Sequence, residues 1–417
     1  MRDIKIASII GIFVILLSFR FFFFYQNQPQ YNDGEYISFA ITLLSDPQII
    51  GNQQRINANL ASGERVLVIT SLLPEFHYGD KVAISGTINK RLLNNKKALL
   101  SIYFPKIKAV KTEPGLGIIN SVRQKIITLF SKTLPSPYSS FLLGVVFGIK
   151  EPLPADFKES LRISGVMHVI AASGMNVTII GGVVSSIFGF FLKRQLALIV
   201  TIGVVIFYAM LAGFEPSIVR ASIMGILVFT SQILGRQNMA RNGLLAAGFL
   251  MLFTEPNLLY DIGFQLSFAA TLGLLYIRPL FEQNKKTKIA LKKSLIGSDL
   301  TTTISAQLAT LPILLSNFGS YSLWSVVANG LVLWTIPILM VIGGVSAVIG
   351  LIFMPLGGIL LYLAYPFLLY FEKVVGIFGK MGEAVSVEAI PWPIVIGYYI
   401  MLVACVMFFS RRNIHKK

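Results

Sequence analysis

Long apolar runs constrain the fold of this chain more than any other feature of its sequence. The hydrocarbon core of a bilayer is about 30 Å thick, so a helix that crosses it needs about 20 mostly apolar residues. Runs close to this length recur along most of the chain after residue 137. Charged residues make up only 13% of the composition, against roughly 25% in soluble globular proteins. The sequence therefore predicts a polytopic α-helical membrane protein.

The apolar runs predict about ten transmembrane helices, some of them broken. The run at 323–353 is too long for one helix and contains Pro337 and Gly343, so it is expected to form two. The runs at 138–150 and 241–254 are short for a full crossing. The candidate spans are residues 138–150, 164–192, 195–213, 217–235, 241–254, 260–281, 300–318, 323–353, 357–380 and 391–409.

A further apolar run, residues 4–24, follows Arg2 and Lys5. Since no small-residue cleavage site follows it, residues 1–27 are interpreted as an uncleaved transmembrane anchor rather than a signal peptide. Basic residues collect on the cytoplasmic side of membrane proteins, so the N-terminus is predicted inside and the next segment outside. The basic residues after the last run predict a cytoplasmic C-terminus by the same rule.

The chain carries 36 basic and 19 acidic residues, a formal net charge of +17. Because much of the basic excess lies near span ends, we interpret it as the positive-inside pattern together with attraction to anionic membrane lipids. A contribution from nucleic-acid binding stays open. The lone Cys405 excludes an intrachain disulfide, and His77, His168 and His415 are too widely separated to predict a local metal cluster. No metal or cofactor is expected.

Residues 28–112 differ from the rest of the chain in composition and pattern. Apolar and polar residues alternate with period two, as at 81–88, between glycine turn signals. This pattern predicts a small extracytoplasmic all-β domain of the OB-like barrel type. Residues 113–137 are predicted to be an amphipathic interfacial helix, with Arg123 on its polar face and prolines at its end. Residues 138–417 are assigned to the membrane domain.

Polar residues interrupt the apolar run at HVIAASGMNV, residues 168–177. A broken helix survives in a bilayer only against protein or a water-filled cavity, and transporters build their sites at such breaks. The alternative is that small residues merely allow close helix packing, with an amide as interhelical glue. Both interpretations stay open for the candidate residues of this stretch, His168, Ser173, Gly174 and Asn176.

Further polar residues lie at membrane depth in later spans. Glu215 and Arg220 flank the start of a helix at Pro216 and predict either an ion pair at the helix end or a functional embedded cation. Asp261 and Gln265 share a helix face, because they lie four residues apart. Polar positions in several segments of one membrane unit favour a lined passage over packing alone. The lining candidates from these segments are Glu215, Arg220, Asp261, Gln265, Gln307 and Asn329.

The stretch LLGVVFGIKEPLPADFKESLRISGVMHVIAASGMNVTIIGG resembles the signature region of the ComEC competence protein family. GFEPSIVRASIM, EPNLLYDIGFQLSFAATLGLL and AQLATLPILLSNFGSYSLWSVVAN resemble the following blocks of that family, in the same order. The resemblance covers about residues 138–410, and the β-rich segment before it is similar to the family's extracytoplasmic OB-like domain. Asn176 stands where the family commonly has a histidine.

The resemblance implies import of single-stranded DNA through a channel in the bacterial cytoplasmic (inner) membrane during natural transformation. Many members carry a C-terminal metallo-β-lactamase-like domain, and the residues here predict a form without it, since no His-x-His-x-Asp-His cluster occurs. No G-x-x-x-x-G-K-[ST] loop occurs either. A cytoplasmic ATP-driven motor, a DNA receptor and a nuclease are therefore expected as separate partners. Oligomerisation stays open.

The β-rich domain offers candidate contacts for the DNA strand, because OB-like domains bind single strands by base stacking and phosphate contacts. These candidates are Tyr78, Lys81, Arg91, Lys96 and Lys97.

Two other functions stay open. One is a transporter of another anionic or lipid-linked substrate. The other is an intramembrane hydrolase with Ser173 as nucleophile and His168 as base. On a continuous helix, five residues separate two side chains by about 140° in direction, so these two would not meet. The chain is therefore predicted not to be an enzyme.

Overall fold

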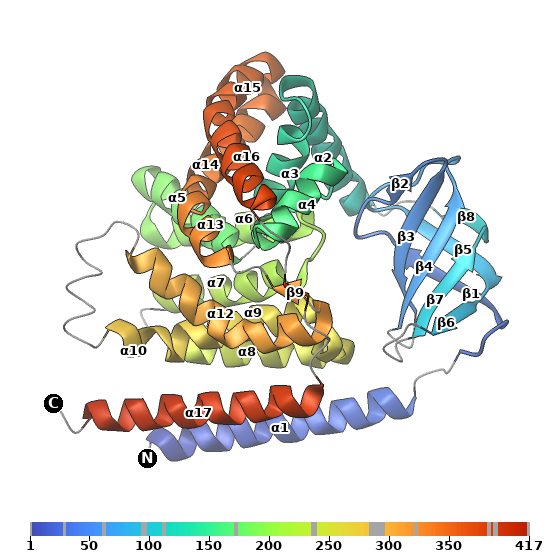
Figure 1. The fold of residues 1–417 in the computed structure, drawn as a ribbon. Helices are drawn as coiled ribbons and strands as arrows, with labels where there is room; N and C mark the ends of the chain where they lie inside the picture. The colour runs from blue at the N-terminus through green and yellow to red at the C-terminus, as the bar shows by residue number, and fades with distance from the viewer. Residues whose placement is uncertain are drawn as a thin grey trace.

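The computed structural model describes residues 2–27, 31–60, 64–92, 98–110, 114–170, 174–234, 240–282, 297–318, 320–321, 324–381, 385–386 and 391–414. It confirms the predicted fold class, since a small all-β domain lies at one end of a mostly helical membrane part (Figure 1). The chain is therefore a multi-pass membrane protein.

Seven helices in the described part are long and apolar enough to cross a membrane, which is fewer than the sequence predicted. They are Gly174–Phe191, Arg194–Leu211, Pro216–Ile233, Ile262–Phe281, Thr335–Ile352, Met354–Lys380 and Trp392–Phe409. Three shorter apolar helices accompany them, Gly11–Gln26, Tyr138–Phe147 and Ala240–Thr254. The predicted short runs thus form helices, but helices below the length of a full crossing.

The helices of the described part follow one another as α1 (Arg2–Gln26), α2 (Pro114–Thr133), α3 (Tyr138–Phe147), α4 (Ala155–Ile163), the 3₁₀ turn η1 (Met167–Val169), α5 (Gly174–Phe191), α6 (Arg194–Leu211), α7 (Pro216–Ile233), α8 (Ala240–Thr254), η2 (Pro256–Tyr260), α9 (Ile262–Tyr276), α10 (Arg278–Glu282), α12 (Gly297–Phe318), α13 (Ser325–Val332), α14 (Thr335–Ile352), α15 (Met354–Leu361), η3 (Tyr362–Ala364), α16 (Tyr365–Lys380) and α17 (Trp392–Ile414).

The β domain has two sheets around one apolar core. A five-stranded sheet has the order β2-β3-β4-β7-β6, and a three-stranded sheet has the order β1-β5-β8. The predicted alternation holds in β5, where Val82 and Ile84 are buried while Ala83 and Ser85 are partly exposed. The strands are β1 (Tyr36–Thr42), β2 (Gln48–Ile50), β3 (Gln53–Asn59), β4 (Arg65–Ser71), β5 (Lys81–Thr87), β6 (Asn89–Leu92), β7 (Ala98–Tyr103) and β8 (Lys106–Val110). Two-residue strands β9 (Ser320–Tyr321) and β10 (Val385–Ser386) pair in the membrane part.

The helix predicted over 164–192 is interrupted. Helix α4 ends at Ile163, and Gly165 follows with φ +73°, a left-handed conformation that favours glycine. The short turn η1 comes next, and α5 begins only at Gly174. Ser173 lies outside the described residues.

The run 323–353 forms two helices, as predicted. Helix α13 ends at Val332 and α14 begins at Thr335. Pro337 does not mark the break; it lies in the first turn of α14, where a missing backbone N–H costs nothing.

Helix α2 is not confined to a surface, which corrects the role predicted for one of its residues. Ile126, Leu129 and Phe130 are buried in the main hydrophobic core of the membrane part. Arg123, predicted on the polar face, is also buried, at 3% exposure. It is accommodated because it finds polar partners at the junction with the β domain.

The β domain is held against the membrane part at the end of α6. Arg123 Nη2 forms an ion pair with Asp46 Oδ2 at 2.6 Å, and Nη1 donates to the carbonyl of Leu211. The hydroxyl of Tyr78 donates to the carbonyl of Met210 at 2.7 Å. These contacts fix the β domain over the end of a membrane helix.

One glycine is required at this junction. Gly213 has φ +72°, and a Cβ there would lie 2.3 Å from the carbonyl oxygen of Leu44. Only glycine permits that approach of the two backbones.

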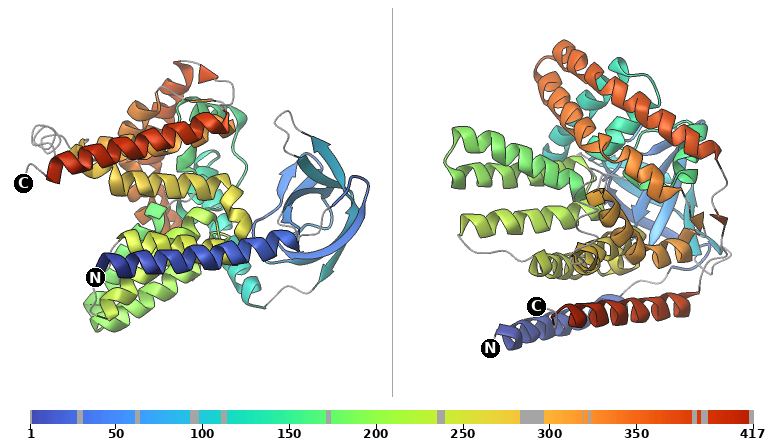
Figure 2. Two further views of the ribbon diagram at one scale, coloured as in Figure 1. Left: turned by 90° about the horizontal axis from the view of Figure 1, so that it is seen from below. Right: turned by 60° about the vertical axis from the view of Figure 1, so that its left-hand side comes forward.

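Both chain ends lie on the side of the molecule away from the β domain. The N-terminal end of α1 and the C-terminal end of α17 are found there in Figures 1 and 2. The side of the membrane on which the two termini lie stays a prediction.

Candidate functional site

Arg220 lies inside the membrane part, held by two hydroxyl groups. It is four residues after Pro216, the first residue of α7, and so about 6 Å along that helix. Its Nε donates to Ser267 Oγ at 2.6 Å and its Nη1 donates to Thr271 Oγ1 at 2.7 Å, both on α9. The side chain is 9% exposed. Neutral hydroxyls orient the guanidinium without cancelling its charge.

Glu215 does not pair with Arg220. Its carboxylate instead forms an ion pair with Lys150, in the loop after α3. Among the described residues, no carboxylate lies within ion-pair distance of Arg220. Of the two interpretations left open by the sequence, the Glu215–Arg220 ion pair is therefore wrong: Glu215 is the non-helical N-cap residue of α7, and its carboxylate is paired with Lys150.

Gly174 lies next to the guanidinium of Arg220. A Cβ added at Gly174 would meet Arg220 Nη2 at 3.2 Å. Gly174 is also the first residue of α5, where a helix carries partial positive charge on its free N–H groups. Two residues predicted from separate segments thus meet, and together they create an electropositive point at membrane depth. An anion is favoured at such a point.

Asn176 braces the helices rather than lining a passage. It is 2% exposed, and its Nδ2 donates to the carbonyl of Val145 at 2.6 Å and to the hydroxyl of Tyr208 at 3.1 Å. Tyr208 in turn donates to the carbonyl of Val146 at 2.9 Å. These bonds satisfy carbonyls at the end of α3, which has no further turn to supply donors.

His168 lies in η1, and its side chain is exposed. No hydrogen bond of the described residues joins it to Arg220.

Gln307 and Asn329 meet at Ser325, which the sequence reading did not single out. Gln307 Nε2 donates to Ser325 Oγ at 2.9 Å, and Asn329 Nδ2 donates to the same oxygen at 3.2 Å. Ser325 donates in turn to the carbonyl of Gly165 at 3.4 Å. The group therefore ties α12 and α13 to the interrupted segment. A spacing of four residues between Ser325 and Asn329 was the available signal.

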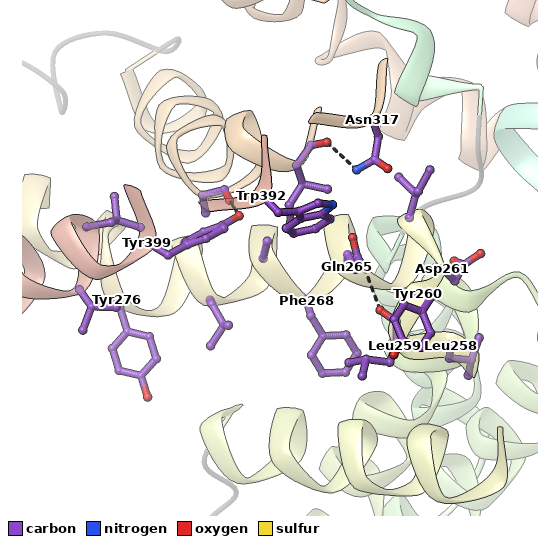
Figure 3. Close-up of a pocket in the computed structure, with 18 of the residues that line it drawn as sticks. Leu258, Leu259, Tyr260, Asp261, Gln265, Phe268, Tyr276, Asn317, Trp392 and Tyr399 are labelled. Atoms are coloured by element: carbon purple, nitrogen blue, oxygen red, sulfur yellow. Dashed lines mark hydrogen bonds between the residues drawn. The ribbon is translucent and has the colours of Figure 1, made fainter. Parts of the chain in front are cut away.

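Asp261 and Gln265 line a cavity of about 1280 Å³ between α9, α12 and α17 (Figure 3). Asp261 is also the N-cap of α9, since its Oδ1 accepts from the N–H of Phe264 at 2.9 Å. Gln265 Nε2 donates to the carbonyl of Leu259 at 2.8 Å. Arg220 is not among the residues that line this cavity.

Tyr78 is wrong as a nucleic-acid contact. Its ring is fully buried, at 0% exposure, and the Arg123 guanidinium lies 4.5 Å from its centroid. Such a ring has no free face for a base. Lys81 is partly exposed. The side chain of Arg91, like Lys96 and Lys97, lies outside the part of the chain that the structure describes.

Exposed aromatic and basic residues are found elsewhere on the β domain. Tyr36, Tyr103 and Phe104 are 63%, 54% and 60% exposed. Lys106 and Lys108, on β8, are exposed too. Their alternating spacing in the sequence was a signal that they share one face of a strand.

Comparisons with known proteins agree with this architecture. The sequence model of the competence protein family matches residues 145–412, more than half of the chain. The chain belongs to the competence protein family. It is 30% identical over 211 residues to ComE operon protein 3 of Bacillus subtilis, covering 50% of this chain and 26% of that protein.

Two uncharacterized proteins are also similar. One, from Aquifex aeolicus, is 31% identical over 147 residues, or 35% of each chain. The other, YcaI of Escherichia coli, is 25% identical over 263 residues, which cover 59% of this chain and 34% of YcaI. The matches thus span about a quarter to a third of these relatives. No solved structure matches the chain.

Proposed function

We propose that this chain forms the membrane channel component for uptake of single-stranded DNA across the bacterial cytoplasmic membrane. Membership of the competence protein family supports the process. The observation that carries the channel role is the setting of Arg220, a buried guanidinium held by hydroxyls and placed beside the first residue of α5. That setting suits a phosphate that passes through and leaves again.

The depth of Arg220 favours function over structure. Its partners Ser267 and Thr271 lie five and nine residues after Ile262, or about 8 and 14 Å along α9. A cation at such depth costs about 3 kcal/mol on insertion scales, so it is retained where a task requires it. The guanidinium stays charged at any working pH and has the planar shape that fits phosphate oxygens.

A DNA strand can pass only if the site attracts each phosphate without holding it. A single cation with neutral hydroxyl partners meets this requirement better than a dense basic cluster, because each phosphate must exchange for the next. The carboxylate of Glu215 is occupied by Lys150 and so leaves the field of Arg220 uncancelled at this point.

The β domain supplies an entry surface in this proposal. In the register of the three-stranded sheet, Ser85 pairs with both Ser38 and Lys106, and Ala83 pairs with Lys108. Small side chains thus lie beside exposed lysines, which leaves a shallow strip for a phosphate backbone. The exposed aromatic rings at Tyr36, Tyr103 and Phe104 offer stacking faces for bases.

The partners follow from the same proposal. The DNA receptor, the nuclease and the ATP-driven motor act as separate units, and no residue of this chain is assigned to catalysis. Strand movement then depends on energy supplied from the cytoplasmic side.

Uptake of labelled single-stranded DNA tests the proposal, in cells whose own copy is deleted and replaced by variants at equal membrane level. Arg220→Gln should abolish uptake, and Arg220→Lys should retain part of it, since lysine still supplies a point charge. Glu215→Gln should cost much less, because Glu215 pairs with Lys150. Arg162→Gln is the matched control, since Arg162 is an exposed arginine paired with Glu159 on α4.

Normal uptake by Arg220→Gln would overturn the channel role of this residue. If deletion of the whole chain leaves DNA uptake intact while the cells lose transport of another anionic or lipid-linked compound, the alternative transporter function replaces the proposal.

A further inference from the structure

The cavity between α9, α12 and α17 differs in chemistry from one end to the other (Figure 3). One end is polar and lies beside the β domain, since Asn59 of β3 contributes to its wall. The remainder is apolar. The polar end is lined by Asn59, Glu255, Asn257, Asp261, Gln265 and Asn317. A cavity with this division fits an amphiphile better than a wholly polar or wholly apolar ligand.

The polar end is acidic. Glu255 and Asp261 both line it, and none of the described lysines or arginines does. Arg20 of α1 lies near the end of α8, but it donates to the carbonyl of Phe253 at 3.0 Å and is not part of the wall. The field at this end therefore favours a cation and disfavours a phosphate without a compensating positive charge. A DNA strand would be repelled here.

Gln265 adds an acceptor that needs a donor. Its Nε2 is used by the carbonyl of Leu259, whereas its Oε1 is buried and has no hydrogen-bond partner among the described residues. A buried acceptor without a partner costs free energy, so a donor from a ligand or a water is expected there. The acceptor and the two carboxylates line the same end of the cavity.

The apolar part of the cavity has the dimensions of one leaflet. From Gln265, in the polar end, to Tyr276, α9 runs eleven residues, or about 16 Å. Half of the hydrocarbon core is about 15 Å deep. Leu272, Val403 and Met407 of this part are 45%, 55% and 52% exposed, so the wall opens sideways. An acyl chain that enters from the bilayer fits this length and this opening.

Aromatic residues mark the level of the membrane interface at the polar end. Tyr260 and Trp392, which line the cavity, are 69% and 52% exposed. Tyrosine and tryptophan collect at the interface, where an apolar ring and a polar group are both accommodated. The polar end is therefore at the depth of lipid headgroups.

We propose that this cavity binds a phospholipid with a primary ammonium headgroup, of the phosphatidylethanolamine class, from the leaflet that faces the β domain. The ammonium group lies between Glu255 and Asp261 and donates to Gln265 Oε1, and one acyl chain follows α9 and α17. An anionic phosphatidylglycerol is selected against by the two carboxylates. This site is independent of the DNA-uptake proposal and of Arg220.

Quenching of Trp392 by brominated lipids tests the site. The chain has three tryptophans, so Trp324→Phe and Trp334→Phe leave Trp392 as the reporter. The full chain is reconstituted in phosphatidylcholine nanodiscs with increasing fractions of brominated phosphatidylethanolamine or brominated phosphatidylglycerol. We expect saturable quenching, with a half-quenching fraction about threefold lower for phosphatidylethanolamine, the size of one or two partly screened charge contacts.

Variants distinguish quenching by a lipid bound in the cavity from quenching by the surrounding bilayer. Glu255→Gln together with Asp261→Asn should abolish the headgroup preference, and asparagine still caps α9. Glu75→Gln, an exposed acid on the β domain away from the cavity, is the matched control and should keep the preference. Ala269→Phe fills the cavity and should remove the saturable component for both lipids. Equal half-quenching by the two lipids, or a preference that survives loss of both carboxylates, would overturn the proposal.

Discussion

Tyr398 donates a hydrogen bond of 2.9 Å to the carbonyl of Leu308, the carbonyl that Pro312 leaves without its helical donor. Pro312 lies four residues after Leu308 inside α12 and has no N–H to offer. A freed carbonyl at membrane depth must find a partner on a neighbouring helix. Tyr399 makes a similar bond of 2.7 Å to the carbonyl of Ala309. The two tyrosines fasten α17 to α12 beside the proline.

Removing the two hydroxyls should have unequal effects. Tyr398→Phe leaves the Leu308 carbonyl without any donor and should lower the free energy of unfolding by about 1 kcal/mol. Tyr399→Phe should cost less, because Ala309 is four residues before Ile313, whose N–H remains available to it. Thermal unfolding of the purified protein in one detergent measures both. Equal losses would show that Pro312 does not decide the strength of the Tyr398 bond.

Removing one or the other partner of the ion pair between the β domain and α2 should also have unequal effects on stability. The side chains of Arg123 and Asp46 are 4% and 23% exposed. Asp46→Asn removes the ion-pair partner of the more buried charge and should destabilise the junction by about 3 kcal/mol, near the lower figure for breaking a buried pair. Arg123→Gln should cost less, because water can reach Asp46. Limited proteolysis between β8 and α2 reports the junction. A larger effect from Arg123→Gln would contradict the order.

Glu151 gives the junction a pH dependence. Burial raises the pKa of its carboxyl above the usual value, the charge of Asp46 raises this pKa further, and Arg123 opposes the shift. Between the unfolded and folded pKa values, the native state holds more protons than the unfolded state. The contribution of Glu151 to stability is therefore fully present below the pKa that its carboxyl has in the unfolded state. It is lost as the pH rises through the pKa of the folded state.

Glu151→Gln should remove that dependence. The melting temperature of the variant should exceed that of the unaltered protein at pH 8, and the two should converge near pH 4. Glu159→Gln serves as a control, because the hydrogen bond from Arg162 lowers the pKa of the Glu159 carboxyl, whereas that of Glu151 is raised. A parallel pH profile for Glu151→Gln and the unaltered protein would rule out this assignment.

Two glycines of α5 offer a matched test of the Arg220 site. A Cβ at Gly174 would lie 3.2 Å from Arg220 Nη2 and 3.3 Å from Ala221 Cβ, so Gly174→Ala should displace the guanidinium by a few tenths of an ångström. A Cβ at Gly182 would meet nothing within 4 Å. DNA uptake should fall about fivefold for Gly174→Ala, the value of one weakened hydrogen bond, and stay unchanged for Gly182→Ala. Equal uptake by the two variants would contradict this placement of Arg220.

Local pattern in the sequence predicted the types of element, although it predicted about ten transmembrane helices and the described part has seven that are long enough to cross. Composition and apolar run length require a bilayer, and alternation of period two predicts the strands, as β5 illustrates. The interruption before Gly174 was also visible, because small and polar residues replace apolar ones there. These features depend on the hydrophobicity and backbone preference of residues that are close together in the sequence, so they can be recognised without the tertiary structure.

Long-range contacts decided what each polar residue does. Glu215 pairs with Lys150, 65 residues away, rather than with Arg220 five positions on, and Tyr78 is buried under Arg123 instead of facing solvent. Arg220 itself is held by residues of α9. No spacing of residues in the sequence predicts that α9 contacts α7. The sequence by itself determined that the chain resides in a bilayer, which segments form helices and strands, and where a helix is interrupted, because these follow from hydrophobicity and backbone preference. Only the packing of helices from distant segments chose the partners, since a buried polar group bonds to whatever that packing brings within about 3 Å.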